Sequence, residues 1–448
     1  MANRPRVAAA LKLIAASLLI SGAPFSGAPF SGAPSSRAWA QPKPAAVPLA
    51  DLAAAAAATA LRDGQAALAA KDYAAAGTAF EAANRANPGA ADPYVGLIEV
   101  ALRLRGPQAA TEMLRAGLAA APGSSALRIV EARFALVQNR LPDAVRAFQT
   151  AIALDPTAIA PRLDLADVYA LRLHQPADAL PTYDEVLARD PGNAAATYGR
   201  GIALASLGRG GDAVVALRAA QAAAPGSPRP SLAAGRILLQ AGRRDEALAA
   251  FDGALKIAPG TVAASFGRAE ALEALGQTDA AAAAYAEVLR QDPKSVAALD
   301  RLAMLRQAGG DMAAAAQGFR AALAVNGDDI LALNNLAFMA AEQRADLDQA
   351  LVWARRAVEL GGPVPGLLDT LGWVQRQRGD LAAAAATLQA AVGQGGAQQG
   401  GAVPIFLHLA QVRADLGQTE AAREAVRRAL ALAPDDPAAK AALSRLGG

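Results

Sequence analysis

The chain has no cysteine and only two histidines among its 448 residues. Without cysteine it can form no disulfide, no thiolate metal site and no lipid attachment at an N-terminal cysteine. Two histidines leave few routes to a metal centre or to nucleophilic catalysis. No glycine-rich phosphate loop follows a strand, because no segment alternates between apolar and polar residues as strands do. These absences predict that the chain is not an enzyme and carries no cofactor and no metal.

Aromatic side chains are scarce, at 4% of the residues, and charges of the two signs alternate along the chain. A nucleic-acid groove needs clustered lysine and arginine with interleaved aromatics, so we expect no nucleic-acid partner. The formal net charge of +3 includes four basic residues before Gln41, where there is no acidic residue. Removal of residues 1–40 would leave 39 basic and 40 acidic residues, which is close to neutral.

What the chain does have is a repeat with a period of 34 residues. One position of the cycle returns seven times as proline and then twice as glycine, with a single spacing of 35 among the prolines. The members of this column are Pro88, Pro122, Pro156, Pro191, Pro225, Pro259, Pro293, Gly327 and Gly361. A repeat of this length suits two helices joined by a turn, which bury their apolar face by stacking on further copies.

Two further columns keep the same period. A small residue stands twelve positions before each proline and before Gly327, as a close helix crossing requires: Ala76, Ala110, Ala144, Ala179, Ala213, Ala247, Ala281 and Ala315. Four positions later comes a bulky residue that would fill the space between successive helix pairs: Phe80, Leu114, Phe148, Tyr183, Leu217, Phe251, Tyr285 and Phe319. The three columns together predict an all-α stack.

These columns resemble the pattern of the tetratricopeptide repeat family, which has small residues where helices cross, an aromatic on the second helix and a closing proline. The resemblance implies an all-α, right-handed superhelical solenoid of about eleven helix-turn-helix repeats over residues 57–436, preceded by a linker at 41–56 and followed by a capping segment at 437–448. The expected repeats are 57–90, 91–124, 125–159, 160–193, 194–227, 228–261, 262–295, 296–329, 330–364, 365–402 and 403–436.

The turn inside each repeat should contain a residue that tolerates a left-handed backbone. Glycine occupies that place in most repeats, and Asn139 and His174 occupy it in two others. One extra residue lies between Ala166 and Ala179, and another between Ala337 and Ala350, which predicts a longer loop between the paired helices at both places. The glycine-rich stretch 393–401 predicts a flexible surface loop.

The first forty residues read as a secretory signal peptide. Arg4 and Arg6 precede an apolar stretch, and Ala38-Trp39-Ala40 offers a small-x-small cleavage site. The apolar run is about fourteen residues, short of the roughly 20 that a spanning helix needs. We expect a soluble, exported, periplasmic protein, with secretion or tethering by an uncleaved signal as alternatives. Ser21-Gly22-Ala23 is an alternative, earlier cleavage site.

In proteins of the family that the chain resembles, positions 2, 5, 6, 9, 12 and 13 of each repeat meet a peptide or a partner helix. The first eight repeats place mostly alanine, leucine, glycine and scattered charge there. The last three place amides, an aromatic anchor and charged groups there, which predicts a surface that binds a protein or peptide partner. The candidate residues are Asn334, Asn335, Phe338, Asp369, Thr370, Trp373, Arg376, His408 and Gln411. The alternative interpretation is that Phe338 and Trp373 are core residues.

The same tract carries a narrower resemblance. Residues 331–342, 367–380 and 405–422 are similar to the C-terminal block of large bacterial envelope proteins with tetratricopeptide repeats, including those of exopolysaccharide export and cell-surface sorting systems. The resemblance implies an exported scaffold that mediates protein–protein interactions in the bacterial cell envelope. The alternative that it leaves open is a component of an exopolysaccharide synthesis, export or sorting system, with polysaccharide-export machinery as partner.

Overall fold

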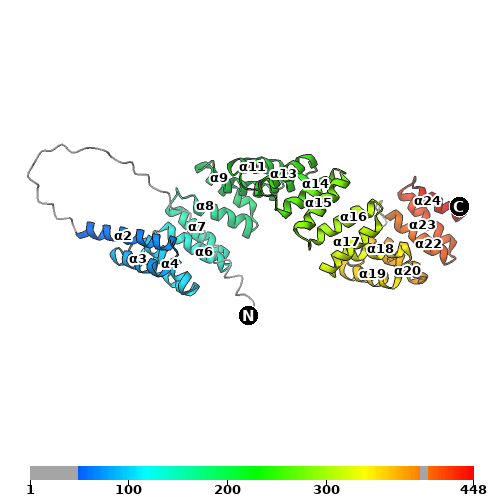
Figure 1. Ribbon diagram of the computed structural model, residues 1–448, viewed down its shortest axis with the longest axis horizontal. Helices are drawn as coiled ribbons and strands as arrows, with labels where there is room; N and C mark the ends of the chain where they lie inside the picture. Colours follow the sequence, from blue (N-terminus) through cyan, green and yellow to red (C-terminus); the bar gives the residue numbers. More distant parts are fainter. Residues whose placement is uncertain (1–48, 394–401, 448) are drawn as a thin grey trace, which may run out of the picture. The chain divides into compact units, whose positions relative to one another are not determined.

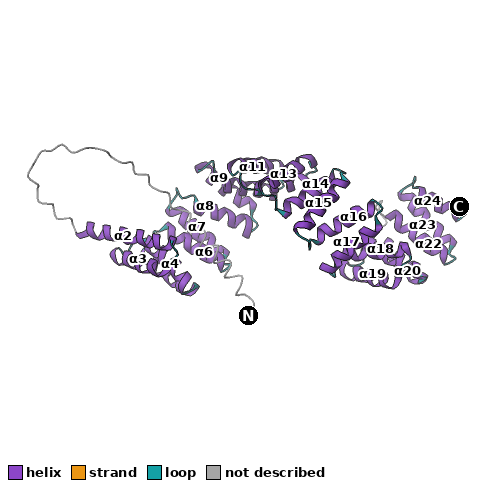
Figure 2. Cartoon of the chain, in the orientation of Figure 1, coloured by secondary structure: helices purple, strands orange, loops and turns teal. Residues whose placement is uncertain are grey.

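The computed structural model describes residues 49–393 and 402–447, and within these ranges it contains helices and loops and no strand (Figures 1 and 2). The chain divides into two compact units, residues 1–225 and 226–448. The expected signal peptide with its cleavage residues Ala38 and Ala40, and residues 394–401 of the expected loop, lie outside the described residues.

The N-terminal unit consists of consecutive helix pairs. Its helices are α2 Leu49–Ala69, α3 Tyr73–Ala86, α4 Ala91–Leu104, α5 Pro107–Ala120, α6 Ser125–Val137, α7 Leu141–Leu154, α8 Ala160–Asp167 with the π-helix η2 Val168–Arg172, α9 Pro176–Arg189, α10 Ala194–Ser206 and α11 Gly210–Ala223. Each pair packs within itself, and each second helix packs on the next first helix. Helix α2 begins at Leu49, inside the stretch 41–56 that we expected to be a linker.

The C-terminal unit continues the pattern. Its helices are α12 Arg229–Gln240, α13 Arg244–Ile257, α14 Val262–Ala274, α15 Thr278–Gln291, α16 Val296–Ala308, α17 Met312–Val325, α18 Ile330–Gln343, α19 Leu347–Gly361, α20 Pro365–Arg378, α21 Leu381–Gly393, α22 Val403–Asp415, α23 Thr419–Leu432 and α24 Pro437–Arg445. Helix α24 packs on α22 and α23 in the segment where we expected a cap. The predicted class, an all-α stack of helix pairs, is confirmed.

The alanine column forms the crossing points of the pairs. All eight alanines predicted from the sequence have 0% exposure, and Ala350, Ala384 and Ala422 continue the column with the same exposure. The bulky column is equally inaccessible, with Phe148, Phe251 and Phe319 at 0%. Because contacts of this kind join only neighbouring helices, the core is a series of small clusters along each unit.

The bulky column packs against glycine on the adjacent first helices. A side chain at Gly235 would approach the ring of Phe251 to 2.8 Å, and one at Gly267 would overlap the same ring. Two first helices therefore approach one phenylalanine from two sides, and glycine leaves the room that its ring takes. The close stacking of successive pairs depends on these small positions.

The expected left-handed turns are present. Asn139 has φ 57° and His174 has φ 54°, so the histidine has the structural role that the repeat assigns to it. The glycines at the same place in the other repeats, such as Gly276 at φ 73°, share this conformation. This turn fixes the angle at which the second helix folds back on the first.

The extra residue of the fourth repeat is not in a loop, so that expectation is wrong. Ala166 and His174 are eight positions apart, where Ala269 and Gly276 are seven apart, and the additional residue lies within η2. The amide of Leu173 donates to the carbonyl of Val168 at 3.0 Å, a bond that spans five residues. A π-turn takes up an insertion without changing the helix faces on either side.

The second extra residue does lengthen the turn, as expected. Arg344 takes the left-handed place that Gly310 has in the preceding repeat, and two residues, 345 and 346, separate it from α19, where one residue, 311, separates Gly310 from α17. Both Arg344 and Asp346 are left-handed, at φ 52° and 47°. The chain thus accommodates two single-residue insertions in two different ways.

Candidate functional site

The nine candidate residues lie on three successive first helices of the C-terminal unit. Helix α20 contacts both α18 and α22, which brings the three helices into one surface. We call it the first-helix face. Its candidate residues are Asn334, Asn335 and Phe338 on α18, Asp369, Thr370, Trp373 and Arg376 on α20, and His408 and Gln411 on α22.

Four of these residues form one cluster. The rings of Trp373 and His408 stack with centroids 4.3 Å apart and planes at 23°, and the guanidinium of Arg376 lies 4.7 Å from the centroid of Trp373. The Nδ1 atom of His408 is 2.8 Å from Oδ1 of Asp369. The cluster ties α20 to α22 through an aromatic stack and a carboxylate–imidazole contact.

Two acidic residues outside the candidate set complete the cluster. The indole N–H of Trp373 donates to Oε1 of Glu342 at 2.6 Å, and Nε of Arg376 donates to Oδ2 of Asp415 at 2.7 Å. Both acids stand at position 13 of their repeats, one on α18 and one on α22. Periodicity could have found them, since that position belongs to the set that we read for recognition.

Trp373 is not an exposed anchor. It is 7% exposed and belongs to a core cluster against which Phe338 packs, so little of the indole is accessible to a partner. The expectation of an aromatic anchor at the surface is therefore wrong for this residue. Thr370 is also buried, at 4%. Of the nine candidates Gln411 is exposed, and the half-buried ones are Asn334, Asn335, Phe338, Asp369, Arg376 and His408.

A column of polar residues runs beside this cluster. Asp300, Asn334 and Asp369 occupy position 5 of the repeats that begin at 296, 330 and 365. Asp300 is 7% exposed, and neither its Oδ1 nor Oδ1 of Asn334 receives a hydrogen bond from the described residues. Buried acceptors are nearly always paired in folded proteins. Two unpaired acceptors on successive first helices are therefore unusual.

Asp300 is also electrostatically strained. Burial, together with the like charge of Asp329 at the start of α18, raises the pKa of Asp300 to about 7. Asp329 itself caps α18, where its Oδ1 accepts from the amide of Ala332 at 2.9 Å. We missed Asp300 in the sequence because we treated the first eight repeats as lacking a polar surface. The repeat period did indicate Asp300, because it stands at position 5, 34 residues before Asn334.

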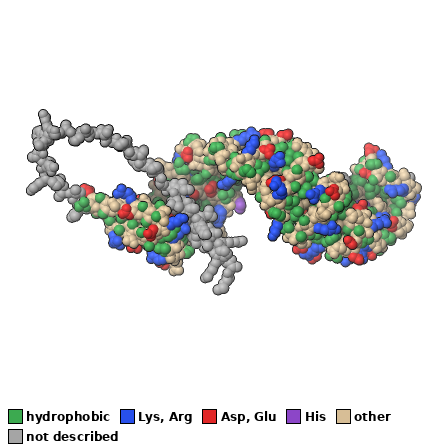
Figure 3. Space-filling model, in the orientation of Figure 1, with side chains coloured by type: hydrophobic (Ala, Val, Ile, Leu, Met, Phe, Trp, Pro, Cys, Tyr) green, Lys and Arg blue, Asp and Glu red, His purple; other side chains and the backbone are tan. Residues whose placement is uncertain are grey.

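Charge on the two units is mixed. Figure 3 shows basic and acidic side chains interspersed over the visible face of each. In the described ranges, no group of three or more histidine and acidic side chains is arranged to hold a metal ion. Among the helices of the same ranges, none combines the length and the apolar character needed to cross a bilayer.

Family models agree with the repeat pattern. A model described as tetratricopeptide repeat matches residues 95–159, 165–228 and 232–296, and a second model with the same description matches residues 403–446. No curated protein matches the chain.

The chain is similar to several solved structures. YrrB, titled a TPR protein with an unusual peptide-binding site, is 23% identical, with 43% of this chain and 98% of that one covered and a TM-score of 0.38. A tetratricopeptide repeat protein from Parabacteroides merdae is 18% identical, with coverage of 56% and 99% and a TM-score of 0.43. The APC/C hetero-tetramer Cut9–Hcn1 is 15% identical, with coverage of 86% and 95% and a TM-score of 0.46.

Proposed function

The chain belongs to the tetratricopeptide repeat family, and from that premise we propose that it is an exported scaffold whose first-helix face binds an extended segment of a partner protein. Repeat proteins of this family are suited to protein–protein interaction and are generally non-catalytic. The proposal concerns which surface binds, what chemistry the partner brings and where in the cell the protein acts.

The observation that carries the proposal is the pair of unpaired acceptors in the position-5 column. Oδ1 of Asp300 and Oδ1 of Asn334 have no donor in the part of the chain that the structure describes, and an extended peptide carries backbone N–H groups that could supply one. A buried acceptor without a donor costs about 1–3 kcal/mol. Binding of a peptide that reached these atoms would recover part of that cost, which would make the position-5 column a source of affinity.

The charge of the neighbouring cluster indicates the kind of segment that fits. The cluster contains three carboxylates, those of Glu342, Asp369 and Asp415, and one guanidinium, that of Arg376, which contacts Asp415. These four groups carry two net negative charges. A segment that is neutral or basic and rich in accessible N–H donors complements them, whereas an acidic segment is repelled.

Photo-crosslinking in the native envelope fraction tests the binding surface. A benzophenone amino acid at Gln411, which is exposed on α22, should form an adduct with one partner. The matched control is the same substitution at Gln317, exposed on the second helix α17, which should form none. Adducts at Gln317 alone, or equally at both, would place recognition elsewhere. A partner belonging to polysaccharide export would favour the alternative pathway.

Affinity then tests the acceptors. With a peptide from the crosslinked segment, Asp300→Ala and Asn334→Ala should each weaken binding about five- to tenfold, the equivalent of roughly one hydrogen bond. Thr278→Ala is the control, because this residue begins the second helix α15 and is exposed. Unchanged affinity in both acceptor variants would refute their role.

Export is tested separately. Residues 1–48 fused to a reporter that is active only outside the cytoplasm should give activity, and N-terminal sequencing of the native protein should begin at Gln41. Ala38→Arg should block processing at that site. A start after Ala23 would identify the earlier site, an uncleaved membrane-bound chain would identify a tether, and an inactive reporter would refute export.

A further inference from the structure

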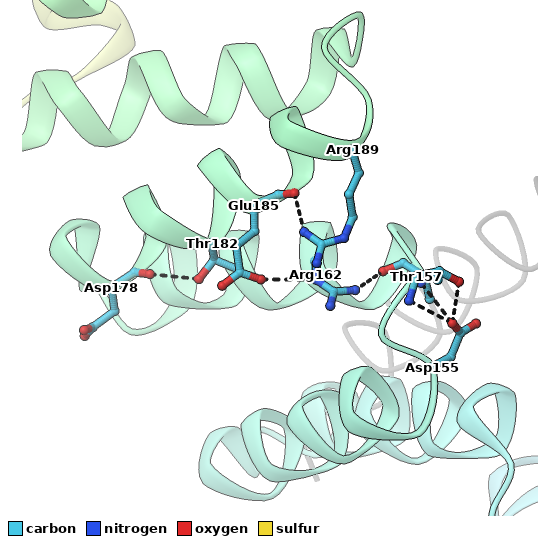
Figure 4. Close-up of polar contacts among 8 residues, drawn as sticks. Asp155, Thr157, Arg162, Asp178, Thr182, Glu185 and Arg189 are labelled. Carbon is cyan, nitrogen blue, oxygen red and sulfur yellow. Dashed lines mark hydrogen bonds and ion pairs between the residues drawn. The ribbon is translucent and has the colours of Figure 1, made fainter.

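One repeat of the N-terminal unit fills the space between its helices with an arginine. Arg162, on the first turn of α8, is 3% exposed, and its Nε donates to Oε2 of Glu185 on α9 at 3.1 Å. Its Nη1 donates to the carbonyl of Ala158. Figure 4 shows the side chain directed at Glu185. A buried guanidinium can thus occupy the space between the first and the second helix of one repeat.

The turn before α8 is fixed by its own polar contacts. Thr157 donates from its amide and its hydroxyl to Oδ1 of Asp155, at 3.0 and 2.7 Å (Figure 4). These bonds hold the pKa of Asp155 below its usual value. The carbonyl of Ala158 that receives Arg162 is therefore on an ordered turn, which makes the arginine site a built part of the repeat.

The corresponding place in the C-terminal unit is open. Ser265 on α14 is the equivalent of Arg162, because Ser265 stands four residues before Ala269 as Arg162 stands four before Ala166. Glu287 on α15 is the equivalent of Glu185, because Glu287 stands six residues after Ala281 as Glu185 stands six after Ala179. Instead of an arginine, the repeat has a cleft of about 400 Å³. The residues lining it are Asp252, Leu255, Lys256, Ser265, Arg268, Ala284 and Glu287.

The three repeats that follow have a large apolar residue at the same place. The equivalents of Ser265 in α16, α18 and α20 are Leu299, Leu333 and Leu368. Ser265 is 5% exposed, and its hydroxyl is 3.3 Å from Oε1 of Gln291. The position of Ser265 thus varies between repeats: it is arginine in α8, leucine in these three helices, and a small polar residue in α10 and α12, at Thr197 and Ser231.

The charged side chains that line the cleft differ in how strongly they are paired within the chain. Arg268 is bound to Asp252, with Nε donating to Oδ1 at 2.7 Å. Glu287 contacts Arg290, which is 75% exposed, and accepts from Nε2 of Gln291 at 3.0 Å. An exposed ion pair three residues apart on a helix is weak, so an incoming guanidinium can displace Arg290. Lys256 is exposed at the edge of the cleft, where its charge would repel a second cation.

We propose that this cleft binds an arginine side chain of a partner peptide, with Glu287 as the acceptor, in the way that Glu185 binds Arg162 within the chain. The site is on a different side of α14 from the first-helix face. On α14 the positions that form the first-helix face in later repeats include position 5, Phe266, and position 9, Glu270. Ser265 is rotated from Phe266 by about 100° around the helix axis and from Glu270 by about 140°. The proposal is therefore independent of partner binding at the first-helix face.

Titration with short peptides tests the site. The mature chain should bind Ac-Gly-Arg-Gly-NH₂ with a millimolar dissociation constant by ligand-observed NMR, and Ac-Gly-citrulline-Gly-NH₂, which has the same shape without the charge, at least tenfold more weakly. The lysine peptide should also bind less well, because an ammonium lacks the fork geometry that suits a carboxylate. Equal binding of the arginine and citrulline peptides would overturn the proposal.

Variants locate the effect. Glu287→Gln should weaken binding of the arginine peptide at least tenfold, and Ser265→Arg should abolish it because the new side chain takes the place of the ligand. Ser265→Leu, which copies the neighbouring repeats, should abolish it too, and Ser265→Ala should leave it unchanged. Glu185→Gln is the control in the other unit and should have no effect. Full binding by Ser265→Leu would overturn the proposal.

Discussion

At the scale of single residues, the carboxyl of Asp300 makes stability depend on pH. An unfolded aspartate has a pKa of about 3.9, and in the folded chain that of Asp300 is raised to about 7. Between these values the native state binds more protons than the unfolded state, so stability falls as pH rises from about 4 to 7. Asp300→Asn should therefore stabilise the chain at pH 8, by at most about 4 kcal/mol, and have little effect near pH 4.

Chemical denaturation at both pH values measures this effect. Asp329→Asn is the matched control, because asparagine caps a helix as well as aspartate does while the like charge is lost. It should give a smaller gain, since burial is the larger cause of the raised pKa. A pH-independent change in Asp300→Asn would contradict the assignment.

Trp373 gives a second prediction for a single residue. Because the indole is 7% exposed, Trp373→Ala should cost about 3–5 kcal/mol in urea denaturation, as truncation of a buried aromatic does. Trp373→Phe keeps a ring against His408 and loses the bond to Glu342, at a cost of about 0.5–1.5 kcal/mol. An unchanged urea midpoint for Trp373→Ala would contradict the burial of the indole and favour the surface anchor that the sequence predicted.

The sequence predicted the burial of some of these side chains and not of others. The alanines and aromatics of the repeat columns were predictable because their spacing fixes which side of a helix they occupy. The burial of Trp373 was not, because position 9 lies where core and surface meet and the stack with His408 decides the outcome. The unpaired oxygens of Asp300 and Asn334 depend on where donors lie in space, and sequence spacing does not give that.

At the scale of helices, the π-turn η2 predicts an unusual tolerance to deletion. Removing Leu171, which is 58% exposed within the turn, should restore seven positions between Ala166 and His174 and leave the helix faces in place. We expect a melting temperature within a few degrees of the original. Circular dichroism during heating would measure it.

Deletion in a regular helix is the control. Loss of Ile202 from α10 rotates the rest of the helix by about 100° and displaces the buried Leu204. That variant should lose most of its cooperative unfolding. Equal damage from both deletions would mean that the extra residue of η2 is structurally required.

The helices themselves were largely predictable, and their irregularities were not. A 34-residue period with closing prolines determines where pairs begin and end. A single inserted residue can enter a turn, as at Asp346, or a helix, as in η2, and the two cases look alike in a count of residues. Local packing and hydrogen bonding decide between them.

At the scale of the whole molecule, damage should remain local. Ala247 has 0% exposure at a crossing in α13, so Ala247→Leu should overpack it at a cost of about 1–3 kcal/mol. Hydrogen exchange should show lost protection in α12 to α15, which contact one another in sequence, and preserved protection in α20 to α23. The neighbouring Ala249→Leu, at an exposed position, should change neither. Uniform loss along the chain would contradict a solenoid.

The π-turn also bears on how repeats of this chain are compared with one another. An alignment that allows gaps only in loops would pair Leu173, and not His174, with the left-handed glycine column. The residues of η2 would then be shifted by one column against every other repeat. Placing the gap inside the helix restores His174 to the turn and makes the register of the fourth repeat consistent on both sides of the insertion.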